Sequence, residues 1–167
     1  MTRKERVLAA IKKQPVDRVP ASFSLHFPEN LRKGQAAVDA HIDFLKATEC
    51  DILKIMNENL VPLVGEMNGP EDWNQIPTYS LEDGFIKEQL ELTKGVLEAG
   101  GDDVYTLATI HGICASTIHP IEARYGYQEV RQMLVDHLRE NPEPVLSAMD
   151  RIADIMCELV AESAKLG

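Results

Sequence analysis

The 167-residue chain has few cysteines, a deficit of basic residues and no long apolar segment. Its three cysteines, Cys50, Cys114 and Cys157, are odd in number and widely spaced, which argues against a disulfide framework and favours a reducing compartment. No apolar run approaches the roughly 20 residues that a membrane-spanning helix needs. The charged N-terminus lacks the apolar block of a signal peptide. These absences favour a cytoplasmic protein with no membrane partner.

Acidic residues dominate the charge of the chain. The chain has 27 Asp and Glu residues and 17 Lys and Arg residues, which gives a formal net charge of −10 and an isoelectric point of about 4.9. Binding to nucleic-acid phosphates requires clustered basic side chains, and here they are dispersed among acids. We therefore expect a small-molecule substrate and no nucleic-acid partner.

Helical and strand-like segments alternate along the chain. Apolar residues at helical spacing predict helices over 3–11, 31–45, 81–100, 120–125, 127–140 and 142–165, the first of them ending before Pro15. Short apolar runs predict strands over 19–27, 51–56 and 103–110, and a long loop over 57–79. This alternation is typical of parallel βαβ units, and by itself it permits a doubly wound sheet as readily as a barrel.

The opening of the chain carries a family resemblance. Residues 2–20 read TRKERVLAAIKKQPVDRVP and lead into the apolar run VPASFSLH. This succession of short helix, proline-aspartate turn and strand resembles the start of the uroporphyrinogen decarboxylase superfamily. The resemblance implies an α/β fold, a partial (β/α)8 TIM barrel with the first three βα units and an extra N-terminal helix. Because such a barrel takes about 250 residues, we expect 1–167 to be its truncated N-terminal half.

In an α/β barrel the active site forms at the carboxyl ends of the strands. Asn57 and Glu58 follow the predicted strand 51–56. The resemblance places Glu58, or Asn57 one residue earlier, where decarboxylases hold the pyrrole N–H groups with an essential aspartate and stabilise the protonated ring. A glutamate supplies the same charge from a longer arm. We predict Glu58 as the catalytic residue and Asn57 as a substrate contact; the alternative is a solvated loop acid.

His26 lies at the end of the predicted first strand. It is a candidate for substrate binding or proton transfer, and the alternative is a loop histidine bonded to backbone. True decarboxylases carry arginines in this region that clamp the substrate carboxylates, whereas this chain reads SLHFPEN. The difference favours a divergent or methyltransferase-type member over an authentic decarboxylase.

His111 and His119 follow the third predicted strand and are further candidates for substrate binding. The resemblance puts His119 near a tyrosine that contacts substrate in decarboxylases. His111 and Cys114 form a lone H-x-x-C, a weak metal signal, because zinc requires three or four ligands. A closed barrel could bring these residues and His26 together. We nevertheless predict no metal site in this chain.

The resemblance implies two activities in tetrapyrrole or corrinoid metabolism. One is decarboxylation of a tetrapyrrole in porphyrin biosynthesis, a lyase reaction that needs no cofactor because the protonated pyrrole is the electron sink. The other is zinc-dependent methyl transfer between a corrinoid protein and a thiol or other acceptor. The zinc ligands of that branch lie on later strands, so zinc is expected only with the absent C-terminal half.

Two further hypotheses remain. An open set of parallel strands leaves unpaired edges and an exposed apolar face, so the chain could be an inactive half-barrel that self-associates or binds a complementary chain. It could also be a small-molecule binding module on a compact α/β fold. We expect a homo-oligomer, and little activity from this half alone.

Overall fold

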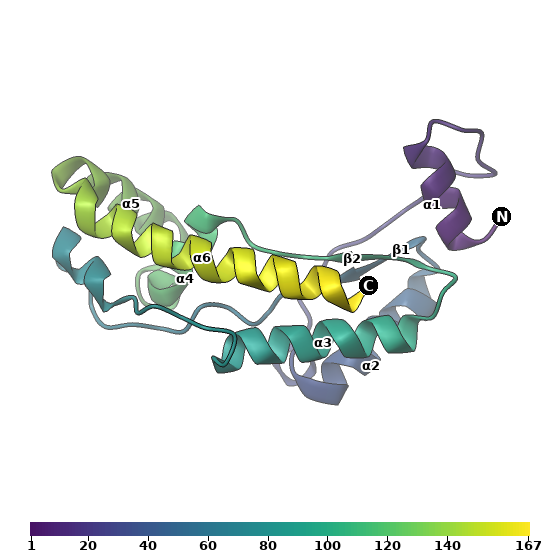
Figure 1. Ribbon diagram of the computed structural model, residues 1–167, viewed down its shortest axis with the longest axis horizontal. Helices are drawn as coiled ribbons and strands as arrows, with labels where there is room; N and C mark the ends of the chain where they lie inside the picture. The colour runs from purple at the N-terminus through teal and green to yellow at the C-terminus, as the bar shows by residue number, and fades with distance from the viewer. The chain divides into compact units, whose positions relative to one another are not determined.

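The computed structural model describes all residues from Met1 to Gly167 and shows an α/β protein, mostly helical, with one two-stranded parallel sheet (Figure 1). The α/β class is confirmed. In chain order the elements are α1 (Arg3–Ile11), the 3-10 helix η1 (Glu29–Leu31), α2 (Gly34–Thr48), β1 (Ile52–Ile55), the 3-10 helix η2 (Pro70–Gln75), α3 (Gly84–Gly100), β2 (Tyr105–Ala108), α4 (Ile113–Tyr125), α5 (Tyr127–Glu140) and α6 (Pro142–Leu166).

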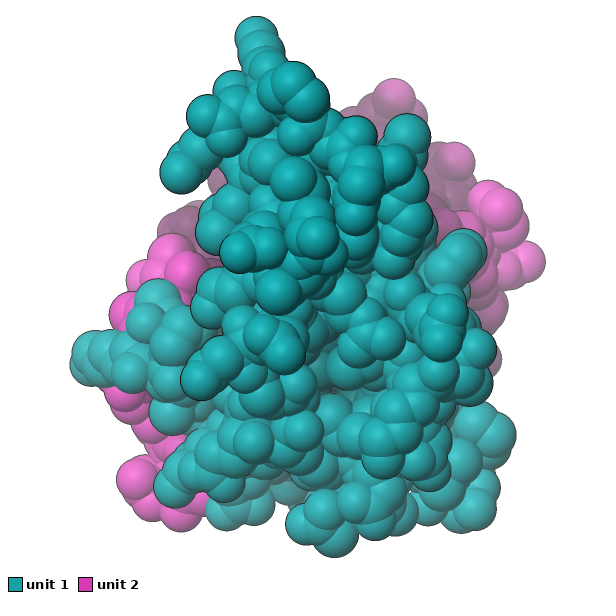
Figure 2. Space-filling model, turned by 90° about the vertical axis from the view of Figure 1, so that its right-hand side faces the viewer, with its two compact units in different colours: residues 1–58, 88–109, 163–167 teal, residues 59–87, 110–162 magenta.

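Two compact units make up the chain, coloured separately in Figure 2. Unit 1 comprises Met1–Glu58, Glu88–Thr109 and Ser163–Gly167. Unit 2 comprises Asn59–Lys87 and Ile110–Glu162. All three cysteines are free thiols.

Unit 1 is built around the parallel pair of β1 and β2, with Ile52 beside Tyr105 and Ile55 beside Ala108. Side chains alternate between the faces of a strand, and Leu53 and Ile55 are buried on one of them. That face packs into a core to which α2, α3 and the residues next to the strands also contribute. The buried residues of this core are Ala37, Val38, Leu45, Cys50, Leu53, Ile55, Leu92, Val96 and Val104. The two helices therefore cover one face of the sheet.

The strand predicted over 19–27 does not form, so the sheet has two strands and not three. The segment still runs beside the start of β1, because the Ala21 carbonyl accepts hydrogen bonds from the amides of Asp51 and Ile52 at 2.9 and 3.3 Å. Pro20 has no amide hydrogen to donate to a ladder. The Ser22 hydroxyl donates to the Ile52 carbonyl at 3.4 Å, a side-chain bond in place of a backbone one.

Helix α1 matches its prediction and is tied to unit 1 by buried charges. Thr2 and Glu5 form a capping box at its start, and Lys13 ends it with a φ of 56°. The Arg6 guanidinium bonds Asp17 through Nε at 2.6 Å and Asp51 through Nη1 at 2.5 Å. Arg18 bonds Asp51 at 2.7 and 2.9 Å. The opening helix is thereby held to the start of β1.

Unit 2 contains η2, α4, α5 and most of α6. The helices predicted over 127–140 and 142–165 are confirmed. The helix predicted to begin at Pro120 begins instead at Ile113 and carries Pro120 in its interior, so the common position of proline in a first helical turn misled the prediction. Within the predicted loop 57–79, η2 holds the buried Trp73, whose Nε1–H donates to His137 Nδ1 at 2.9 Å.

Gly95 allows α3 to approach α2 closely. A Cβ built on Gly95 would lie 2.8 Å from Val38 Cγ2, and the β-branched valine cannot rotate away freely. We expect Gly95→Ala to lower the free energy of unfolding by about 1–3 kcal/mol, measured by urea denaturation. Gly84→Ala is the control, because nothing lies within 4 Å of the place that its Cβ would occupy. Equal stability of the two variants would contradict the close approach.

Candidate functional site

The clearest group of chemically active side chains lies just beyond the carboxyl end of β1, in unit 1. Glu58 follows the strand by three residues, and its side chain is only 9% exposed. His26 Nδ1 lies 2.9 Å from Glu58 Oε1, where the ring donates to the carboxylate. Arg32 Nε lies 3.8 Å from Glu58 Oε2. We call Glu58, His26 and Arg32 the Glu58 cluster. Two basic groups thus compensate for the burial of one acid.

The segment between α1 and α2 supplies both basic partners. His26 is on the extended stretch beside β1, and its side chain is 80% exposed. Arg32 follows η1, where its Nε donates to the Phe27 carbonyl at 2.6 Å. Because Phe27 follows His26 in the chain, this bond keeps the Arg32 side chain close to the backbone next to His26. The structure therefore brings together two of the predicted residues, His26 and Glu58.

Asn57 is buried in unit 1 beside Glu58 in the sequence. Its predicted contact with substrate stays a prediction. The backbone around it is fixed by buried side chains, since the Met56 amide donates to His41 Nε2 at 2.9 Å and Gln89 Nε2 donates to the Met56 carbonyl at 3.4 Å. The end of the strand is therefore held from both α2 and α3.

His111 and His119 lie together in unit 2. Their ring centroids are 4.9 Å apart, with the planes at 79°. Burial lowers the pKa of His119 to about 4, and the nearby charges of His111 and Arg131 act in the same direction. His119 is consequently neutral at pH 7 and available as a hydrogen-bond donor and acceptor. The predicted contacts of His111 and His119 with substrate stay a prediction.

No group of three or more His, Cys, Asp and Glu side chains in the chain has an arrangement suited to a metal ion. Cys114, next to His111 in the H-x-x-C pattern, is exposed. The neighbouring imidazoles of His111 and His119 alone fall short of the three or four ligands that zinc takes.

Sequence reasoning missed three residues near the end of β1. Arg32 joins the Glu58 cluster, His41 holds the Met56 amide, and Lys54 lies in β1 with its Nζ donating to Ser24 Oγ at 2.7 Å. Two of them had a signal in the sequence. Lys54 interrupts the apolar run DILKIM, and His41 shares the buried side of its helix with Val38 and Leu45.

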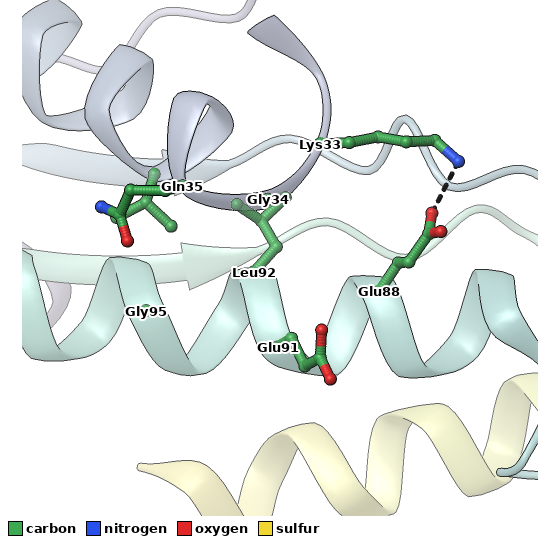
Figure 3. A pocket seen from close by; sticks show the side chains of 8 residues that line it. Lys33, Gly34, Gln35, Glu88, Glu91, Leu92 and Gly95 are labelled. Carbon is green, nitrogen blue, oxygen red and sulfur yellow. Dashed lines mark ion pairs between the residues drawn. The ribbon is translucent and has the colours of Figure 1, made fainter.

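A hollow of about 370 Å³ lies between the start of α2 and the middle of α3, also in unit 1. In Figure 3 the Lys33 ammonium and the Glu88 carboxylate point toward each other across it, 2.7 Å apart. Gln35 and Glu91 add polar groups, and Leu92 adds an apolar one. The hollow contains no imidazole or thiol, and its lysine is already paired with an acid. The Glu58 cluster is the stronger candidate for acid–base chemistry.

No protein-family model matches the chain, and no curated protein and no solved structure matches it either. None of its helices combines the length and the apolar character that crossing a bilayer requires. Fold and site together define an α/β protein with a paired, largely buried carboxylate at the carboxyl end of a parallel strand.

Proposed function

We propose that the chain forms the opening part of a (β/α)8 barrel in a cytoplasmic enzyme of the uroporphyrinogen decarboxylase superfamily. This enzyme would be a divergent or methyltransferase-type member of the superfamily. Its substrate would be a tetrapyrrole, or a methyl donor carried by a corrinoid protein. One observation carries it: Glu58, three residues beyond a parallel strand, is largely buried and paired with His26. Barrel enzymes of this architecture keep their catalytic groups at that end of the strands.

Glu58 is the proposed charged anchor. A carboxylate with little access to water interacts strongly with a positive charge or an N–H group of a ligand. In a decarboxylation the ring becomes cationic on protonation and then accepts the electron pair released with carbon dioxide. His26 donates to Glu58 and faces solvent, so it would exchange protons next to such a ring. A zinc-dependent relative would use the same anchor, with metal ligands from elsewhere.

The absence of arginines from 24–30 supports the divergent member. Besides His26, the basic side chains near the carboxyl end of β1 are Arg32 and Lys54, and both lie outside 24–30. Arg32 is engaged by the Phe27 carbonyl and the Glu58 carboxylate. It is therefore less available to clamp the several carboxylates of a uroporphyrinogen.

A second candidate function is self-association through the sheet. In the two-stranded sheet β2 has a neighbour on one side only, and Leu107 in this strand is 48% exposed. An open strand edge with an apolar side chain is a template for pairing with another chain. This observation favours an inactive half-barrel that forms a homo-oligomer or recruits a complementary chain.

Sedimentation velocity with detection at 280 nm and in the visible band of a bound pigment tests both candidates. The probes are uroporphyrin and hydroxocobalamin. We expect one of them to sediment with the protein, and Glu58→Gln to weaken that binding about tenfold, because the variant lacks the anchoring charge (about 1.4 kcal/mol).

The matched control is Glu98→Gln, an acid of α3 whose side chain is 69% exposed. We expect this variant to bind as the wild type does. Sedimentation of the protein without either pigment would contradict the enzyme proposal, and a dimer under those conditions would support self-association. Equal affinities for the two glutamine variants would remove Glu58 from the site.

A further inference from the structure

His41 is a buried polar residue of α2 in unit 1. The buried side of this helix is otherwise apolar, since its other buried residues are Ala37, Val38 and Leu45. The ring is only 2% exposed. Burial of an imidazole is unfavourable unless its nitrogens are hydrogen-bonded, and here both of them are. Nδ1 lies 2.6 Å from the Ala37 carbonyl oxygen, and Nε2 lies 2.9 Å from the Met56 amide nitrogen.

These two partners determine the proton positions on the ring. The Ala37 carbonyl can only accept, so Nδ1 carries the hydrogen; the Met56 amide can only donate, so Nε2 is the acceptor. The ring is therefore neutral, in one tautomer. Burial lowers the pKa of His41, against the opposing effects of the Ala37 carbonyl and the Glu58 carboxylate. A ring protonated on both nitrogens would present a donor to the Met56 amide and break the bond.

The bond to Met56 acts at the base of the Glu58 cluster. Met56 is the first residue after β1 and precedes Glu58 by two residues. The same imidazole packs against the Phe27 ring, at 4.8 Å between centroids. Phe27 follows His26 in the chain, and its carbonyl accepts from Arg32. One ring thus contacts both stretches of chain that supply the members of the cluster.

We infer that His41 is a positioning residue, whose neutral ring sets the backbone at the end of β1 so that Glu58 meets His26. The inference rests on the proposed role of Glu58 for its functional meaning, and on the hydrogen bonds alone for its structural content. A histidine that merely filled the core would be replaceable by any side chain of similar size.

Two substitutions separate these roles. In His41→Gln the side-chain amide oxygen reaches the place of Nε2 and can accept from the Met56 amide. In His41→Asn the shorter amide can donate to the Ala37 carbonyl, as Nδ1 does, but falls short of Met56. The two variants have the same kind of polar group, so their comparison isolates the bond to Met56.

The main readout is the ring nitrogen NMR signal of His26, with Glu58→Gln as the reference for a broken His26–Glu58 contact. We expect His41→Gln to keep the wild-type signal and His41→Asn to move it to the reference position. Met56 amide hydrogen exchange should accelerate at least tenfold in the asparagine variant only. Pigment affinity should follow the same order, within twofold for glutamine and about tenfold weaker for asparagine.

Unchanged His26 signals in the asparagine variant, or equal changes in both variants, would overturn the inference. If His41→Asn does not fold, His41→Gln still decides, because loss of the wild-type His26 signal in that variant contradicts positioning through Met56. A wild-type protein that binds neither pigment would refute the proposed function and leave the NMR comparison valid.

Discussion

Asp51→Ala is expected to lower the free energy of unfolding by about 3–5 kcal/mol, because it removes the only acid that meets two arginines at the start of β1. The Asp51 side chain is 0% exposed. It accepts hydrogen bonds from Arg6, from Arg18 and from the Ala21 amide. Without it the buried Arg6 loses one of its two carboxylate partners, and the segment after α1 loses the bonds that Arg18 and the Ala21 amide donate to this carboxylate. Urea denaturation followed by circular dichroism measures the change.

The control is Asp43→Ala in α2. The Asp43 side chain is 78% exposed, and its nearest cation, on Lys46, is 3.9 Å away. Exposed pairs of this kind contribute about 0–1 kcal/mol. A loss of stability in Asp51→Ala no greater than in this control would contradict the network at the start of β1.

The same network predicts sensitivity to acid. Burial acts to raise the pKa of Asp51, but the hydrogen bonds from Ala21 and Arg6 and the charges of both arginines outweigh it, so the pKa lies below its ordinary value of 3.8. The ionised form therefore stabilises the folded state at pH values above 3.8, and this contribution is lost as the pH falls through the lowered pKa. The stability of Asp51→Asn should fall less steeply with acid than that of the wild type, and parallel slopes would contradict this assignment.

Trp73→Ala is expected to destabilise unit 2 by about 3–5 kcal/mol, the range for loss of a large buried aromatic side chain. Trp73 is fully buried in η2. Its indole donates to His137, and the two rings meet edge to face with 6.3 Å between centroids. Its carbonyl accepts from Arg151 at 3.3 Å. The substitution would leave a cavity and an unpaired imidazole nitrogen between η2 and α5.

Trp73→Phe is the matched variant, since it keeps most of the apolar volume and loses only the indole N–H. We expect Trp73→Phe to lower the free energy of unfolding by no more than half as much as Trp73→Ala does. Circular dichroism is the suitable probe, because Trp73 is the only tryptophan of the chain and its fluorescence disappears with it. If Trp73→Ala lowered the free energy of unfolding by less than about 1 kcal/mol, as ordinary surface substitutions do, the position of Trp73 in the core would be contradicted.

Local patterns predicted most of the helices. The spacing of Arg6 and Val7 in α1 and the apolar positions of α5 and α6 act within one or two turns, so no knowledge of the rest of the chain was needed. Two local rules failed. The apolar run 19–27 formed no strand, and α4 started before Pro120 and not at it. At 19–27 Pro20 has no amide hydrogen to donate to a ladder, and α4 carries Pro120 in its interior.

The sequence by itself determined the acidic character of the protein, its βα alternation and the position of Glu58 after an apolar strand. The tertiary structure alone decided what Glu58 meets. His26 is 32 residues away in the chain, and His41 reaches the Met56 backbone over 15 residues. Apolar periodicity reports which side of a helix or strand is buried, because burial repeats with the geometry of the backbone. Polar pairs such as Glu58 with His26 form where distant segments return to the same place, and that depends on the packing of the whole core.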